Sequence, residues 1–164
     1  MKETGDYTLI DCPAGIERGL RNSLNAGADE TVIVVTPDDL CIRDAERTCA
    51  LIDQKKLPRP RLIVNRLNQD LIQEGTMYSA QVVSEVLDLP LLGEVPDDPA
   101  VYQAQLRHAF VADYQCEARE ALLRIASRIS GAVPPLPEYG KKKTGFFRRH
   151  FPRKLKEVSI RNGR

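Results

Sequence analysis

The sequence lacks the features that mark membrane-spanning and secreted proteins. Its apolar residues never form the run of about 18 that a spanning helix needs, and no secretory signal opens it. His108 and His150 have no neighbouring ligands or bases in the sequence, so neither is a credible metal ligand or catalytic base. The cysteines show neither metal spacing nor a paired framework, and we expect reduced thiols at all four positions: Cys12, Cys41, Cys49 and Cys116. These absences predict a protein kept in the cytosol.

The charges of the 164-residue chain are divided unevenly along it. The net charge is only +1, with 42% apolar and 29% charged residues, as in an ordinary globular domain. Residues 141–164 hold ten of the 24 basic residues and one of the 23 acidic residues, a balance of +9. The first 140 residues therefore carry 14 basic and 22 acidic residues, a balance of −8. An acidic body with a basic tail indicates different roles for the two parts.

Apolar runs that favour strands alternate with segments of helical periodicity. Buried strands are expected at residues 7–10, 31–35, 61–65 and 91–95. Helices are expected after Gly15, from the N-cap Asp39 to about Lys55, after the N-cap Ser79, and at about 99–109 and 113–130. Residues 68–76 are expected to form a polar loop. This alternation predicts a doubly wound α/β sheet.

A carboxylate and a glycine turn follow the first expected strand. Asp11 ends the run, and Gly15 lies in the turn that follows. Ligands bind at the carboxyl ends of strands in open α/β sheets, and a carboxylate there suits Mg²⁺ and phosphate. An ordinary strand end followed by a helix cap is the alternative, and the local chemistry leaves both open.

Five segments resemble, in order, blocks of one protein family. They are DYTLIDCPAGIE (6–17), VVTP (34–37), IRDAER (42–47), LIVNR (62–66) and LPLLGEVPDD (89–98). The first resembles the Walker B and switch II segment of the MinD family of bacterial septum-placement ATPases, in the ParA/MinD class, although Cys12 stands where a serine is usual. That family carries a glycine-rich P-loop with two lysines, and the sequence contains no such loop. The resemblance is therefore to the C-terminal portion of the family.

The resemblance implies an incomplete, doubly wound, mostly parallel sheet of the P-loop NTPase type, with a C-terminal amphipathic tail. It places part of the ATPase domain in residues 1–131, a proline-rich linker in 132–140 and a membrane-targeting tail in 141–164. In the family, the P-loop strand lies between the strands expected at 7–10 and 31–35. Without that strand the sheet has a gap with unpaired backbone groups, so we expect the isolated chain to depend on a complement.

The resemblance also implies site residues for ATP and Mg²⁺. Asp11 would hold the Mg²⁺ ion through water or order the attacking water, and Gly15 would let the backbone approach the γ-phosphate. Asn65 and Arg66 match the adenine-side pair, since an amide fits the edge of adenine and a guanidinium stacks on its face. The loop at Pro96 and Asp97 would close over the base. A polar strand end with a surface arginine is the alternative for the Asn65 pair.

One acidic residue matches a position where MinD-like dimers and their regulators meet. This residue is Asp44, which Arg43 and Arg47 flank. A solvated acid on a helix is the equal alternative, because two neighbouring arginines would satisfy it. Leu40 and Thr76 depart from the residues expected near this surface, a small polar residue and an aspartate.

The basic tail resembles the amphipathic membrane-targeting helix of the family. Phe147 and Phe151 are four residues apart and share a helical face, with Phe146 beside it. Basic residues, which are attracted to anionic lipids, surround these rings: Lys141, Lys142, Lys143, Arg148 and Arg149. A nucleic-acid-binding tail and a disordered solubilising end are the alternatives, and the three phenylalanines favour the membrane.

The function predicted from these features is ATP-dependent regulation of division-site placement, with reversible attachment to the inner face of the cell membrane from the cytoplasm. The expected partners are anionic lipids, a MinC-like inhibitor, a MinE-like activator and, when the ATPase domain is complete, a second copy of the protein. Nucleic acid is disfavoured. ATP hydrolysis is not expected of this chain alone, since it lacks the P-loop amides and lysines. The alternatives are a non-catalytic membrane-docking or partner-binding module and a portion of a ParA-type partitioning ATPase.

Overall fold

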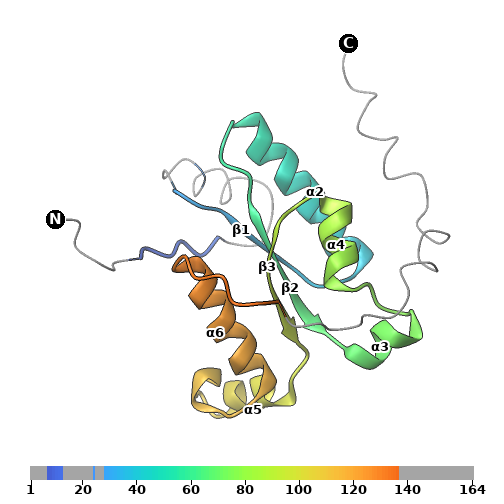
Figure 1. Ribbon diagram of the computed structural model, residues 1–164, viewed down its shortest axis with the longest axis vertical. Helices are drawn as coiled ribbons and strands as arrows, with labels where there is room; N and C mark the ends of the chain where they lie inside the picture. Colours follow the sequence, from blue (N-terminus) through green and yellow to red (C-terminus); the bar gives the residue numbers. More distant parts are fainter. Residues whose placement is uncertain (1–6, 13–23, 25–27, 137–164) are drawn as a thin grey trace.

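Three parallel strands form the sheet of this computed structural model, which describes residues 7–12, 24 and 28–136 (Figure 1). The strands are β1 (Val32–Val35), β2 (Arg61–Leu67) and β3 (Leu91–Pro96), in the order β1-β2-β3. Val32 pairs with Arg61, and Leu62 pairs with Leu91. The strands are aliphatic because helices cover both faces of a parallel sheet. They confirm three of the four expected strands.

Helices on the two faces of the sheet enclose two separate cores. On one face, α2 (Asp39–Gln54) and α4 (Ala80–Leu87) pack against Leu62 and Val64 of β2. On the other face, α6 (Glu117–Ile129) packs against Leu92 and Val95 of β3 (Figure 1). The arrangement is the expected open α/β sheet. Among the described residues, no helix combines the length and the apolarity needed to cross a membrane.

Four boundaries differ from the sequence-based expectations for local reasons. The N-cap of α2 is Asp38, because its extended backbone lets its carboxylate accept a hydrogen bond from Cys41 N at 2.9 Å. The helix α5 (Pro99–Leu106) ends three residues early, and His108 follows with a φ of 51°. A short 3₁₀ helix, η1 (Val111–Asp113), precedes α6, whose N-cap is Cys116. The strand β2 continues two residues beyond the predicted end.

The expected polar loop contains a helix, α3 (Gln69–Glu74). Asn68 caps it by accepting hydrogen bonds from Asp70 N and Leu71 N at 3.0 and 3.2 Å. Ile72 is buried, and Gly75 ends the helix in the left-handed conformation. The cap and the glycine stop are both visible in the sequence, but one buried side chain is too weak a periodic signal to predict the helix.

The prediction of a strand at residues 7–10 is wrong for the described structure. Residues 7–12 are irregular, and Leu9 is 87% exposed. A strand requires a paired neighbour, and β1 pairs only with β2 among the described residues. No strand of the described residues pairs with the outer edge of β1, and Val34, on this strand, is 59% exposed. The helix expected after Gly15 lies outside the described residues except for Leu24, which is helical and buried.

One carboxylate joins the amino ends of α5 and α6. Asp98 Oδ1 accepts from Ala100 N at 2.9 Å, and its Oδ2 accepts from Ala118 N at 3.1 Å. These two bonds, from Ala100 first and Ala118 second, lower the pKa of Asp98. The lowered pKa means that the stabilisation is present above the ordinary carboxyl range and is lost as pH falls through the folded-state pKa.

Asp98→Ala is therefore expected to lower the free energy of unfolding by about 1 to 2 kcal/mol at pH 7, since it removes the caps of two helices. Urea denaturation at a series of pH values from 7 downwards measures this change, which should shrink as pH falls below the ordinary carboxyl range. Asp97→Ala is the matched control, with an expected change within about 0.5 kcal/mol because its carboxylate is exposed. Equal losses in the two variants would contradict the capping role.

Candidate functional site

A β-bulge lies where β2 approaches its carboxyl end. Val64 is opposite Glu94 and Leu67 is opposite Pro96, so Asn65 and Arg66 together oppose the one residue between, Val95. Arg66 has a φ of 60°, a left-handed conformation that costs a non-glycine residue about 1 kcal/mol. Bulges redirect side chains and occur often beside active sites. The bulge thus turns the two residues predicted to contact adenine out of the regular strand pattern.

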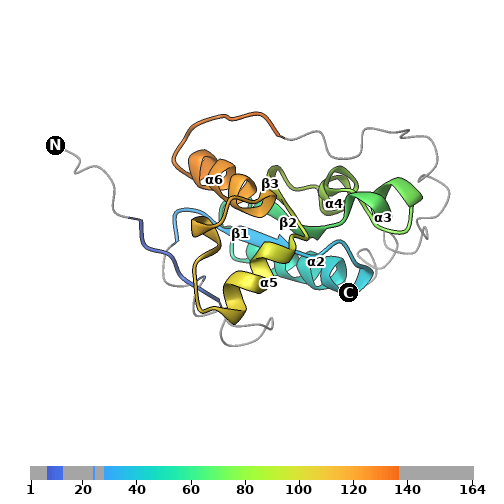
Figure 2. The same ribbon diagram turned by 90° about the horizontal axis from the view of Figure 1, so that it is seen from below.

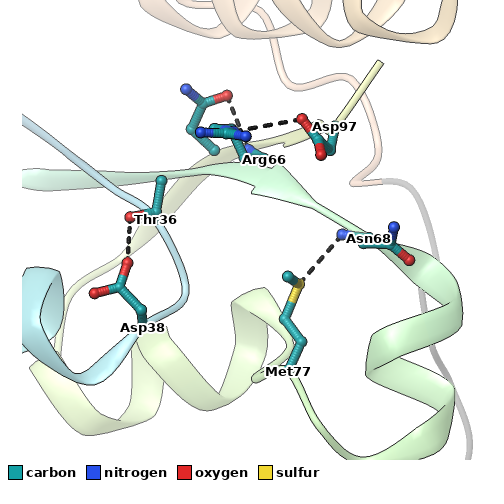
Figure 3. A network of polar contacts seen from close by, with 7 residues as sticks. Thr36, Asp38, Arg66, Asn68, Met77 and Asp97 are labelled. Atoms are coloured by element: carbon teal, nitrogen blue, oxygen red, sulfur yellow. Dashed lines mark hydrogen bonds and ion pairs between the residues drawn. The ribbon is translucent and has the colours of Figure 1, made fainter. Parts of the chain in front are cut away.

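Polar contacts gather the predicted residues at this end of the sheet (Figure 3). Asn65 Oδ1 accepts from Arg66 N at 2.9 Å, and Arg66 Nε lies 3.4 Å from Asp97 Oδ1. Asp97 N donates to Leu67 O at 2.9 Å, next to Pro96, which ends β3. Both charged groups are largely exposed, so the ion pair contributes about 0 to 1 kcal/mol. Its main effect is to orient Arg66 and Asp97.

A second polar cluster follows β1. The Thr36 hydroxyl lies within hydrogen-bond distance of the Asp38 carboxylate and 3.0 Å from Cys41 Sγ (Figure 3). The hydrogen bond from Thr36, followed by that from Cys41 N, lowers the pKa of Asp38 and keeps this group anionic. This cluster was not predicted from the sequence. Its signal was the pair Thr36 and Asp38 directly after a predicted strand, since an aspartate there can cap the following helix and a nearby hydroxyl can donate to it.

The loop between α3 and α4 flanks the same end of the sheet. Met77 Sδ accepts from Asn68 N at 3.2 Å, just after β2 (Figure 3). Tyr78 donates to Asp39 Oδ1 at 3.0 Å and so connects this loop to the start of α2. Burial, followed by the hydrogen bond to Asp39, raises the pKa of Tyr78. These contacts fix the loop beside the carboxyl ends of β1 and β2.

The polar groups at this end of the sheet can contact a planar ring, and the described residues provide no phosphate-binding loop of their own. The Asn65 NH₂ group has no hydrogen-bond partner in the described part of the chain, so it can donate to a ring nitrogen while Oδ1 keeps a second acceptor site. Arg66 presents a planar, exposed guanidinium that can stack on a base. No glycine-rich turn follows β1, β2 or β3. Within residues 7–12, 24 and 28–136, no group of three or more His, Cys, Asp or Glu side chains could hold a metal.

The other predicted site residues do not join this cluster. Asp44 lies on α2 and pairs with Arg47 of the same helix at 3.1 Å, in an exposed ion pair. Asp11 is exposed in the irregular segment 7–12 and does not follow a strand. Some predicted residues lie outside the described residues: Gly15, Lys141, Lys142, Lys143, Phe146, Phe147, Arg148, Arg149 and Phe151.

Glu94 is a buried carboxylate that was not predicted from the sequence either. Glu94 lies on β3 and is 2% exposed. Its Oε1 accepts a hydrogen bond from Gln81 Nε2 of α4 at 2.9 Å, and its Oε2 has no partner in the described structure. Burial raises its pKa to about 7, against smaller opposing effects from Gln81 and from Arg128 and Arg124 of α6. The signal that could have revealed it is a glutamate within an aliphatic run that predicts a buried strand. Charged side chains are almost never buried unless paired, so a glutamate at such a position is unusual.

Similarity to solved structures defines the class of fold. The Aquifex aeolicus MinC:MinD cell division protein complex contains a chain that matches with a TM-score of 0.76 and 32% identity, over 83% of this chain and 56% of that one. Pyrococcus horikoshii MinD in complex with Mg-ADP matches in fold with a TM-score of 0.67 at 24% identity, over 79% and 52%. No protein-family model matches the sequence. The architecture is that of an α/β domain of the P-loop NTPase type, with an open, parallel sheet.

Sequence relatives identify the family within this class. Bacillus subtilis septum site-determining protein MinD is 38% identical over 138 residues, which are 83% of this chain and 51% of that protein. The chain belongs to the MinD family. It spans about half the length of the curated relatives it matches.

Proposed function

We propose that the chain carries the base side of the nucleotide site and the membrane-attaching segment of a MinD-type, ATP-dependent regulator of division-site placement. The observation that carries the proposal is the bulge that places Asn65 and Arg66 beside Asp97 at the carboxyl ends of adjacent strands. Ligands of open α/β sheets bind at this end. Membership of the MinD family makes a nucleotide the expected ligand.

The nucleotide in this proposal is ATP with Mg²⁺. Asn65 would read the edge of adenine, Arg66 would stack on it, and the loop at Pro96 and Asp97 would close over it. The Mg-ADP complex of the P. horikoshii relative supports this pairing of cofactors. Asp11 and Gly15 would act on the phosphate side, together with a P-loop from the part of the family's length that this chain does not cover. Only the combined protein would hydrolyse ATP.

The open edge of β1 supports this dependence on a complement. A parallel strand as aliphatic as Val32–Val35 is normally covered on both faces and paired on both sides. Val34 is instead exposed, and only β2 pairs with β1 among the described residues. A strand from the uncovered part of the family's length would pair with this edge.

Membrane attachment in this proposal occurs through residues 141–164, from the cytoplasmic side. A single segment with three phenylalanines binds weakly, whereas two segments in a dimer gain avidity without new contacts. ATP-driven dimerisation would therefore control attachment to anionic lipids. A MinC-like inhibitor, supported by the MinC:MinD complex of A. aeolicus, and a MinE-like activator would act on the surface around Asp44.

Co-sedimentation with lipid vesicles tests this function. The chain is co-expressed with the part of B. subtilis MinD that lies outside the matched region, and the purified complex is mixed with vesicles containing phosphatidylglycerol or phosphatidylcholine alone. We expect several-fold more protein to sediment with the anionic vesicles in ATP than in ADP. Arg66→Ala should remove the ATP dependence, whereas Arg59→Ala, at an exposed arginine paired with Asp88, should keep it.

Two results would overturn the proposal in favour of another class of protein. Sedimentation that is equal with ATP, with ADP and without nucleotide would indicate a non-catalytic membrane-docking module. Salt-sensitive binding to duplex DNA without vesicle binding would indicate a ParA-type partitioning protein.

A further inference from the structure

The guanidinium of Arg128, in the last turn of α6, connects three parts of the chain. Nη1 donates to Leu92 O of β3 at 2.6 Å. Nη2 and Nε both donate to Pro134 O, at 2.7 and 3.2 Å. Residues 132–136 are the described part of the proline-rich linker predicted at 132–140, and the name linker is used here for these five residues. One side chain therefore joins the end of α6, the first half of β3 and the linker.

The surroundings of Arg128 hold it in this position. Its own carbonyl accepts from Arg61 Nη1 at 3.5 Å, and Arg61 Nε pairs with Glu30, which precedes β1. Burial, followed by repulsion from Arg124, lowers the pKa of Arg128, while the buried Glu94 carboxylate opposes this change. A guanidinium presents five donors in a fixed planar fork and stays charged, so it can bond two carbonyls at once. A lysine ammonium lacks this geometry.

The linker approaches β3, the strand at the opposite edge of the sheet from β1. In Figures 1 and 2 it runs back from the end of α6 towards β3. Pro134 and Pro135 restrict the backbone dihedral angles here, so one anchored carbonyl limits the positions of the neighbouring residues as well.

We propose that Arg128 is a positioning residue that fixes the linker on β3 and thereby sets the place from which the basic segment 141–164 leaves the α/β domain. The importance of this place for membrane attachment rests on the proposed function. The fixation itself does not, because it depends only on contacts among described residues. Two segments of a dimer reach one membrane together only if their starting points are held in a suitable geometry.

Nuclear magnetic resonance relaxation of the full chain, without lipid, tests the fixation. The probes are the backbone amides of Val133 and Leu136, which flank the two prolines. In the unmodified protein we expect order parameters near the rigid value of about 0.85, and in Arg128→Lys values below about 0.6. Arg124→Lys, one turn earlier on α6, is the matched control and should leave both amides rigid.

Either of two results would overturn the proposal. Val133 and Leu136 could be mobile in the unmodified protein, a result that does not depend on how the variants fold. Alternatively, they could stay rigid in an Arg128→Lys variant whose β1, β2 and β3 chemical shifts are unchanged. Vesicle binding by the unmodified complex is measured separately, so failure of the membrane function and failure of the fixation give different results.

Discussion

Gly93→Ala is expected to lower the free energy of unfolding by about 3 kcal/mol, because α6 lies too close to β3 for any side chain at this position. A Cβ atom there would lie 2.2 Å from Ile125 Cγ1 and 2.7 Å from Cδ1. Ile125 is buried and belongs to the core under α6, so it cannot move aside without shifting the helix. Urea denaturation at pH 7 measures the loss.

A double-mutant cycle separates this close approach from a general effect of the substitution. In the background of Ile125→Ala, which removes the contacting atoms, Gly93→Ala should cost at least about 1 kcal/mol less than in the unmodified chain. Additive losses would contradict a contact between these two residues. Ile125→Ala alone should also destabilise the protein, because it leaves a cavity in the core.

The second large effect is a stability that falls as pH rises through neutrality. The pKa of Glu94 is about 7 in the folded chain and has an ordinary value of 4.5 in the unfolded chain. A carboxyl with a raised folded-state pKa contributes its full stability below pH 4.5 and loses it as pH rises through 7. The shift corresponds to about 2 to 3 kcal/mol between pH 4.5 and pH 8.

Glu94→Gln should remove this pH dependence, because the amide has a similar shape and no charge. The variant should be more stable than the unmodified chain by about 2 kcal/mol at pH 8 and similar to it near pH 5. Urea denaturation at pH 5, 6, 7 and 8 measures the difference. Glu85→Gln, at an exposed position of α4, is the control and should follow the unmodified chain. Parallel pH curves for Glu94→Gln and the unmodified chain would show that Glu94 is not the group responsible.

The sequence predicted the elements whose signals are local. The cap of α4, the periodicity of α2 and α4, and the aliphatic runs of β1 and β3 depend on a few consecutive residues. The face of α6 shows the limit of this approach. Leu122 and Ala121 both lie at helical spacing from Ala118, so periodicity alone does not decide between them, and in the structure Ala121 is buried while Leu122 is 40% exposed.

Features that depend on pairing between distant segments could not be predicted. The expected strand at 7–10 has suitable residues but no paired neighbour in the described structure. The bulge at Asn65 depends on the register of β2 against β3, and the burial of Glu94 depends on the helices that cover β3. The grouping of Asn65, Arg66 and Asp97 was predictable, because adjacent parallel strands end at the same side of a sheet.

The difference between the two edges of the sheet has a consequence for self-association. An open edge is a template for the backbone of another molecule, and the β3 side is approached by the linker that Arg128 holds. A chain with two open edges can polymerise without limit, whereas a chain with one can join only a single partner through its sheet. Among the described residues β1 and β3 each pair with β2 alone, but on β3 the Leu92 carbonyl is already bound by Arg128, so the edge of β1 is the more open of the two. The same edge would then be occupied either by a second copy or by the complementary strand, and the two would compete.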